Sequence, residues 1–136
     1  MNYILAAACC AAFSMVGQTV FEKPVQYTCD VKFKKGSWVM PKMDYRYDSE
    51  KGTVSLLDGM IWDHNDKKWL EATTQKDTET KLVFNWRFRA PSRNKTPIEL
   101  LYTATANKQN GRLNVTALLV EHNHRSFGRG TCKLRK

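Results

Sequence analysis

The stretch KLVFNWRFR, residues 81–89, alternates large apolar side chains with charged or polar ones. Successive side chains of an extended strand point to opposite faces, so this segment would have one apolar face and one polar face. The apolar face comprises Leu82, Phe84, Trp86 and Phe88. The polar face includes Lys81, Asn85, Arg87 and Arg89. A helix would mix these two sets. The segment therefore predicts a strand that buries one of its faces.

The same alternation recurs along most of the chain after residue 25. It predicts eight strands, at residues 26–33, 43–48, 53–62, 69–74, 81–89, 98–107, 112–121 and 128–135. Short turn sequences such as Asp48–Gly52 and Asn110-Gly111 join successive strands, which indicates antiparallel pairing. The apolar faces must be buried against one another. We therefore expect an all-β fold, a single antiparallel meander of about eight strands that closes into a small barrel or barrel-like sandwich.

Two cysteines, Cys29 and Cys132, fall on the apolar faces of the first and last predicted strands. A disulfide between them would join the two strands that close a barrel, and such bridges form in oxidising compartments. The alternative is two unrelated buried thiols. Gly128 and Gly130 precede Cys132 and predict a close approach of another backbone to the last strand.

The first 17 residues contain no Asp, Glu, Lys or Arg and are mostly apolar. This run is too short to span a bilayer comfortably and is typical of a secretory signal. We expect a signal peptide at residues 1–17, cleaved between residues 14 and 18, and a single β domain at residues 18–136. No Lys or Arg precedes the apolar run. An N-terminal anchor or a buried first strand are therefore alternatives. The signal predicts a periplasmic or secreted protein with no transmembrane helix after cleavage.

The 136-residue chain carries 22 Lys and Arg against 13 Asp and Glu, a formal charge of +9. This excess disfavours cationic partners and permits nucleic acid, an anionic glycan, a lipid headgroup or an acidic protein. Export would separate the protein from most nucleic acid, so we do not expect that partner. The chain lacks the glycine-rich, zinc-binding and nucleophile-elbow motifs of the common enzyme classes.

Two segments without acidic residues contain much of the positive charge, residues 81–95 and 125–136. They predict one or two anion-binding surfaces, and the alternative is a pair of ordinary solvated strand faces. The candidate anion-binding residues are Arg87, Arg89, Arg93, Lys95, Arg125 and Arg129. Trp38, in the loop after the first strand, is a candidate contact residue or a plug at one end of a barrel.

His122 and His124 would share one face if they lay on a strand, and two imidazoles could then bind one metal ion. A polar loop is the alternative, because no further ligands are close in the sequence. We expect no resident metal or other cofactor. The scattered serines are not paired with a base in any recognisable pattern, so we expect no enzymatic activity. An enzyme built from carboxylates that meet only in the folded chain is the alternative.

The opening Tyr27-Thr28-Cys29 and the ending Phe127–Cys132, FGRGTC, resemble those of uncharacterised exported proteins from alphaproteobacteria. The chain is also similar to the membrane-bound C-type lysozyme inhibitors, small periplasmic β-barrels that bridge a Tyr-x-Cys strand to a late cysteine. It lacks the Ser-Gly-x-x-Tyr stretch of their inhibitory loop, and its charge would repel a basic lysozyme. The resemblance therefore implies the fold and not the inhibition.

These observations predict an exported binding module for an anionic envelope component or an acidic protein surface. A carrier that holds a small apolar molecule inside the barrel, a lysozyme-inhibitor-like protein and an enzyme are the alternatives.

Overall fold

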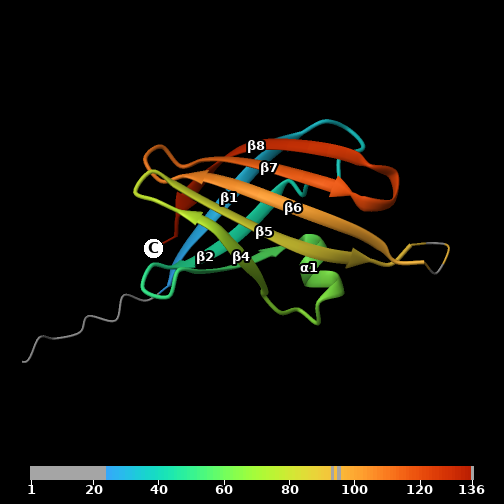
Figure 1. Ribbon diagram of the computed structural model, residues 1–136, viewed down its shortest axis with the longest axis horizontal. Coiled ribbons are helices and arrows are strands. Elements are labelled where there is room, and N and C mark those ends of the chain that lie inside the picture. The colour runs from blue at the N-terminus through green and yellow to red at the C-terminus, as the bar shows by residue number, and fades with distance from the viewer. Residues whose placement is uncertain (1–23, 93, 95, 136) are drawn as a thin grey trace, which may run out of the picture.

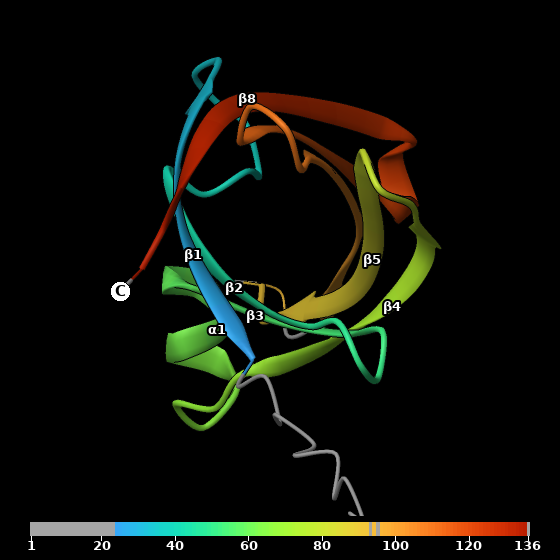
Figure 2. The ribbon, with the colours of Figure 1, turned by 90° about the vertical axis from the view of Figure 1, so that its left-hand side faces the viewer.

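In the computed structural model, residues 24–92, 94 and 96–135 are described, so the predicted signal peptide and its cleavage site lie outside the described residues. The described part forms a closed antiparallel barrel in which each strand pairs with the next and β8 pairs with β1. Figure 1 shows β5 to β8 side by side, and Figure 2 shows the strands arranged around a central axis. The strands are β1 Val25–Phe33, β2 Lys42–Asp48, β3 Thr53–Asp58, β4 Leu70–Asp77, β5 Lys81–Ala90, β6 Ile98–Asn107, β7 Arg112–Leu119 and β8 His124–Leu134. The predicted all-β meander is confirmed, and it closes as a barrel.

Side-chain acceptors and glycines form the two hairpin turns that the sequence predicts. Asp48 Oδ1 accepts hydrogen bonds from the backbone N–H groups of Glu50 and Lys51, and Gly52 completes the turn at φ 64°. Asn107 Oδ1 accepts the equivalent bonds in the turn between β6 and β7, where Gly111 has φ 72°. Positive φ values of this size favour glycine, which explains its place at both turns.

The strand predicted at residues 53–62 is wrong in its second half, because β3 ends at Asp58 and the helix α1, Gly59–His64, follows. The Asp58 carboxylate accepts a hydrogen bond of 2.8 Å from the backbone N–H of Ile61, which caps the first turn of the helix. Ile61 is buried beneath the barrel wall. An isolated six-residue helix is unstable in water, so this packing decides the local structure.

The boundaries around β8 also differ from the prediction. The strand predicted at residues 112–121 ends at Leu119, and a 3₁₀ turn, η1 Val120–His122, follows it. Asn123 then adopts a left-handed conformation with φ 46°, which reverses the chain into β8. This last strand begins at His124, four residues before the predicted start, because its pairing with β7 extends to Leu119.

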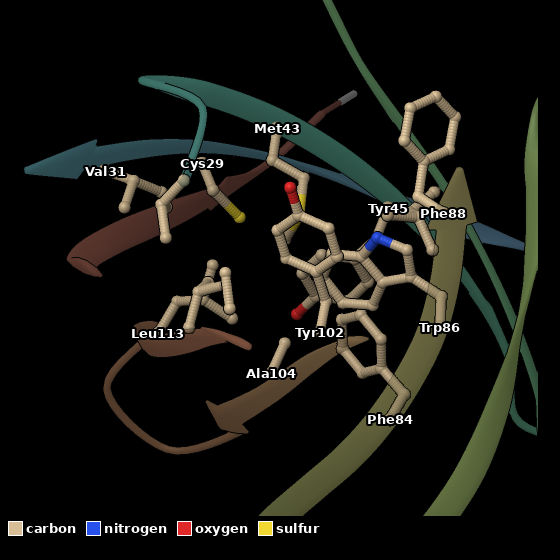
Figure 3. Packing of buried hydrophobic residues seen from close by; sticks show 14 of the residues in the cluster. Cys29, Val31, Met43, Tyr45, Phe84, Trp86, Phe88, Tyr102, Ala104 and Leu113 are labelled. Carbon is tan, nitrogen blue, oxygen red and sulfur yellow. The ribbon is translucent and has the colours of Figure 1, made fainter. Parts of the chain in front are cut away.

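Aromatic side chains from neighbouring strands fill the barrel interior (Figure 3). Trp86 and Tyr102 stack with their ring centroids 4.9 Å apart and their planes 2° from parallel, and Phe84 packs against Trp86. The cavity that remains beside Trp86, Tyr102 and Asp58 has a volume of about 10 Å³. This cavity has room for about one water molecule.

The barrel closes where β1 and β8 lie side by side. Cys29 and Cys132 are directly opposite each other in this pair and form a disulfide, as the sequence predicts. A Cβ atom on Gly130 would lie 2.1 Å from the carbonyl oxygen of Asp30, so only glycine lets the two strands approach this closely. No helix in the described part of the chain has the length and apolar character needed to cross a membrane.

Candidate functional site

Strand β8 has a buried face and an exposed face that carries positive charge. Ser126 and Gly128 point inward and are buried, so their neighbours Arg125, Phe127 and Arg129 point outward. Phe127 is 65% exposed, which is unusual for a phenylalanine in a strand of a barrel. The outer face of β8 therefore combines two cations with an exposed aromatic ring between them.

The strands on either side of β8 add further cations. Lys32 on β1 is directly opposite Arg129, and Arg112 on β7 is directly opposite Thr131. Figure 2 shows β1 crossing beside β8, and the chain continues from the end of β1 into an exposed loop with Lys34 and Lys35. We call these residues the β8 basic face: Lys32, Lys34, Lys35, Arg112, Arg125 and Arg129.

Two hollows lie on the β8 basic face. The first has a volume of about 330 Å³ and is lined by Lys34, Lys35, Gly36, Ser37, His124, Arg125, Ser126 and Phe127. The second has a volume of about 500 Å³ and is lined by Lys32, Arg112, Leu113, Asn114, Arg129, Gly130 and Thr131. Neither lining contains an acidic residue, and within the described residues no member of the face forms an ion pair. Their charges are available to a ligand.

Two of the other predicted anion-binding residues, Arg87 and Arg89, lie on a strand that does not neighbour β8. Arg87 and Arg89 are exposed on β5, which is separated from β8 by β6 and β7. The Nε atom of Arg87 lies 3.0 Å from a carboxylate oxygen of Glu99 on β6. Arg93 and Lys95 lie outside the described residues. The two basic segments of the sequence are thus not adjacent in the barrel.

A shallow depression nevertheless connects Arg87 with Arg125. It has a volume of about 380 Å³ and crosses the outer face from β4 to β8. We call it the outer trough, and the side chains that line it from the outer face are Thr73, Asn85, Arg87, Leu101, Thr103, Thr116, Leu118 and Arg125. Arg125 belongs both to this trough and to the smaller hollow of the β8 basic face.

Sequence reasoning finds Arg125 and Arg129 but misses the four cations that β1, its following loop and β7 contribute. A signal for one of them exists in the sequence. The predicted disulfide places Cys29 opposite Cys132, and antiparallel pairing then places Lys32 opposite Arg129, as observed. The positions of Lys34, Lys35 and Arg112 beside β8 could not be predicted until the closure of the barrel and the course of its loops were known.

Trp38 lies in the loop after β1. It is half-buried and packs against the core, and its backbone oxygen accepts a hydrogen bond of 2.8 Å from the hydroxyl of Tyr102. Its backbone N–H donates to the Ser126 hydroxyl. These contacts tie the loop after β1 to β6 and β8.

His122 and His124 do not lie on one strand. His122 ends η1, His124 begins β8, and the left-handed Asn123 separates them. Both imidazoles are exposed. Among the described residues, no three His, Cys, Asp or Glu side chains are close enough together to hold a metal ion.

A small polar cluster ties three segments together at one end of the barrel. Asp77 on β4 accepts hydrogen bonds from the hydroxyl of Tyr47 on β2 and from the ammonium of Lys108, in the turn after β6. The hydrogen bonds from Lys108 and Tyr47 lower the pKa of Asp77 below its ordinary value. The cluster therefore stabilises the barrel only while Asp77 is ionised.

The β8 basic face has the chemistry of an anion-binding surface. Arg and Lys donate charge-assisted hydrogen bonds to carboxylates, phosphates and sulfates, and an exposed phenylalanine adds an apolar contact. Cations from several elements can contact several anionic groups of one ligand at once.

No protein-family model matches this chain, and neither a curated protein nor a solved structure matches it.

Proposed function

We propose that this protein is an exported binding module that recognises an anionic envelope component or an acidic protein surface through the β8 basic face. The observation that supports this proposal most strongly is the gathering of six cations, without an ion pair among the described residues, on β8 and the elements beside it. Three of them, Lys34, Lys35 and Arg125, line one hollow together with the exposed Phe127. The partner is expected to be multivalent, because the two hollows are lined by separate cations.

An ordinary solvated surface is expected to differ from this one. Surfaces that only keep a protein soluble intersperse both signs of charge and expose few large apolar side chains. The linings of the two hollows contain no acidic residue, and Phe127 is 65% exposed between Arg125 and Arg129. Both features favour a binding role over the solvated-face alternative.

The cysteines and the N-terminal sequence support a location outside the cytoplasm. The Cys29–Cys132 disulfide is compatible with an oxidising compartment. The uncharged apolar run at residues 1–17 supports export by a signal peptide. We therefore place the protein in the periplasm or outside the cell, where anionic glycans and lipid headgroups are accessible.

The packed interior favours surface binding over a carrier function. Ligand pockets of drug-sized molecules have volumes of about 300–1,000 Å³. The cavity beside Trp86 and Tyr102 has about 10 Å³, and the stacked aromatic rings around it would have to separate to admit a ligand.

Retention on an immobilised carboxylated polysaccharide tests the proposal. The variant Lys32→Ser/Arg125→Ser/Arg129→Ser removes three charges from the β8 basic face. The control Lys51→Ser/Lys68→Ser/Lys76→Ser removes the same charge from exposed lysines that line neither hollow. We expect the first variant to elute at a clearly lower salt concentration than the control, because clustered cations bind the matrix together. Equal elution of the two variants would show that only net charge matters and would refute the proposed site.

A further inference from the structure

One row of the outer trough consists of residues that lie opposite one another on successive strands, with an arginine at each end of the row. Reading across the sheet from β5 to β8, Arg87 is opposite Leu101, Leu101 is opposite Leu118, and Leu118 is opposite Arg125. Neighbouring strands are about 4.8 Å apart, so the two arginine backbones are separated by about 14 Å along the sheet. Two leucines and no charge lie between them.

The adjacent row of the trough is polar and uncharged. Thr73 on β4, Asn85 on β5, Thr103 on β6 and Thr116 on β7 are successive partners across the sheet. Within the described residues, none of these four side chains forms a hydrogen bond. Their hydroxyl and amide groups can both donate and accept, which suits a ligand with many hydroxyl groups.

Glu99 positions one of the two arginines for binding. It contacts Arg87 through Nε, and the guanidinium also carries two Nη groups that can donate hydrogen bonds to an anion. Arg87 is 64% exposed in spite of this contact. At the other end, Arg125 joins the trough to the hollow lined by Lys34 and Lys35. Positive groups therefore recur at intervals along a path that runs across the strands.

The closed barrel favours an anionic oligosaccharide over an extended acidic peptide as the ligand of this path. An extended acidic peptide commonly binds by adding a strand to a free sheet edge. Every strand of the described barrel pairs with a neighbour on both sides, although β4 pairs with β3 only at residues 70–72. The row from Arg87 to Arg125 lies on β5 to β8, where both neighbours are paired, so no edge is available along it. The side-chain hydroxyls and the two half-buried leucines of the trough offer instead both the polar and the apolar contacts that a sugar ring needs.

We propose that the outer trough binds an elongated anionic oligosaccharide. Acidic groups of the chain bind Arg87 at one end and Arg125, with Lys34 and Lys35, at the other. The hydroxyl groups of the intervening sugars hydrogen-bond to Thr103 and Thr116 and pack on the leucine row. This inference rests on the proposed function, because it names the ligand class of a surface that includes part of the β8 basic face.

Binding of a uronic-acid oligosaccharide long enough to span about 14 Å tests the inference. The variant Thr103→Val/Thr116→Val removes two hydroxyls from the trough and no charge, and valine keeps the strand shape. The control Thr53→Val/Thr105→Val changes two outward threonines that do not line the trough. Calorimetry measures affinity for the oligosaccharide and for polyglutamate, and thermal unfolding confirms that the variants fold.

We expect the trough variant to lose about fivefold or more in affinity for the oligosaccharide, the effect of two hydrogen bonds. Its affinity for polyglutamate and the affinities of the control should stay at the wild-type values. The inference would be overturned if the trough variant bound the oligosaccharide with wild-type affinity. It would also be overturned if the wild-type protein bound polyglutamate more tightly than the oligosaccharide. The proposed function would survive that result if Lys32→Ser/Arg125→Ser/Arg129→Ser still weakened retention on the anionic matrix, and would fail with it otherwise.

Discussion

Gly130 lies opposite Val31 where β8 passes closest to β1. A Cβ atom at this position would approach the Asp30 carbonyl oxygen to 2.1 Å and the Val31 Cα to 3.0 Å. Backbone atoms cannot move aside as a flexible side chain can, so a substitution must separate the two strands. The residue therefore sets the distance across the closing pair, and through it the spacing of Lys32 and Arg129 on the β8 basic face.

We predict that Gly130→Ala destabilises the protein by about 1–3 kcal/mol, the usual cost of forcing an extra carbon into a packed site. Urea unfolding measures the change. Gly59→Ala is the matched control, because nothing lies within 4 Å of a Cβ at Gly59 and its φ is not positive. Equal midpoints for the two variants would contradict the close approach of β1 and β8.

Asp77 gives the stability a pH dependence of known sign. Its pKa is lowered by Lys108 and Tyr47, so its contribution to stability is complete above the ordinary pKa of 3.8 and is lost as the pH falls below it. Asp58 acts in the opposite sense, because burial raises its pKa and stability falls as it ionises. We expect wild type to lose stability more steeply below about pH 4 than Asp77→Asn, in which Asp58 is unchanged. Parallel curves of unfolding free energy against pH would refute this role of Asp77.

A covalent bond, the Cys29–Cys132 disulfide, holds together the pair of strands β1 and β8 that closes the barrel. The disulfide joins residues separated by 103 positions, and the chain-entropy model assigns a loop of this length about 4.7 kcal/mol. We predict that Cys29→Ala/Cys132→Ala lowers the free energy of unfolding by about 2–5 kcal/mol, measured in urea without reductant. An unchanged free energy would mean that the ladder between β1 and β8 closes the barrel without help from the bridge.

Strands could be predicted from the sequence where alternation is strong, and the departures have local causes. Apolar residues continue past Asp58 through Met60, Ile61 and Trp62, so the pattern hides the end of β3. The carboxylate cap and the burial of Ile61 convert this run into α1. Likewise β8 begins at His124, because pairing with β7 extends a segment whose own sequence has little alternation. In both places tertiary contacts overrode the local pattern.

At the scale of the whole molecule, the candidate site depends on which strands the barrel makes neighbours. The described arginines of the two basic segments that were predicted to bind anions lie on β5 and β8, which β6 and β7 separate. Closure instead brings β1 and its loop beside β8, so Lys32, Lys34 and Lys35 join Arg125 and Arg129. Only the predicted disulfide pointed to this neighbour. The outer trough could not be predicted, because it arises from the shape of five adjacent strands.

The most direct test of the β8 basic face is a map of ligand contacts by nuclear magnetic resonance. Backbone amide shifts of the isotope-labelled protein would be followed during titration with a uronic-acid oligosaccharide. We predict that the largest shifts cluster at Lys34, Arg125, Phe127 and Arg129, that they continue along the outer trough through Thr116 and Thr103 to Arg87, and that they disappear together when salt is added. Shifts of similar size around Lys51, Lys68 and Lys76, or none at β8, would contradict the assignment of this face as the binding site.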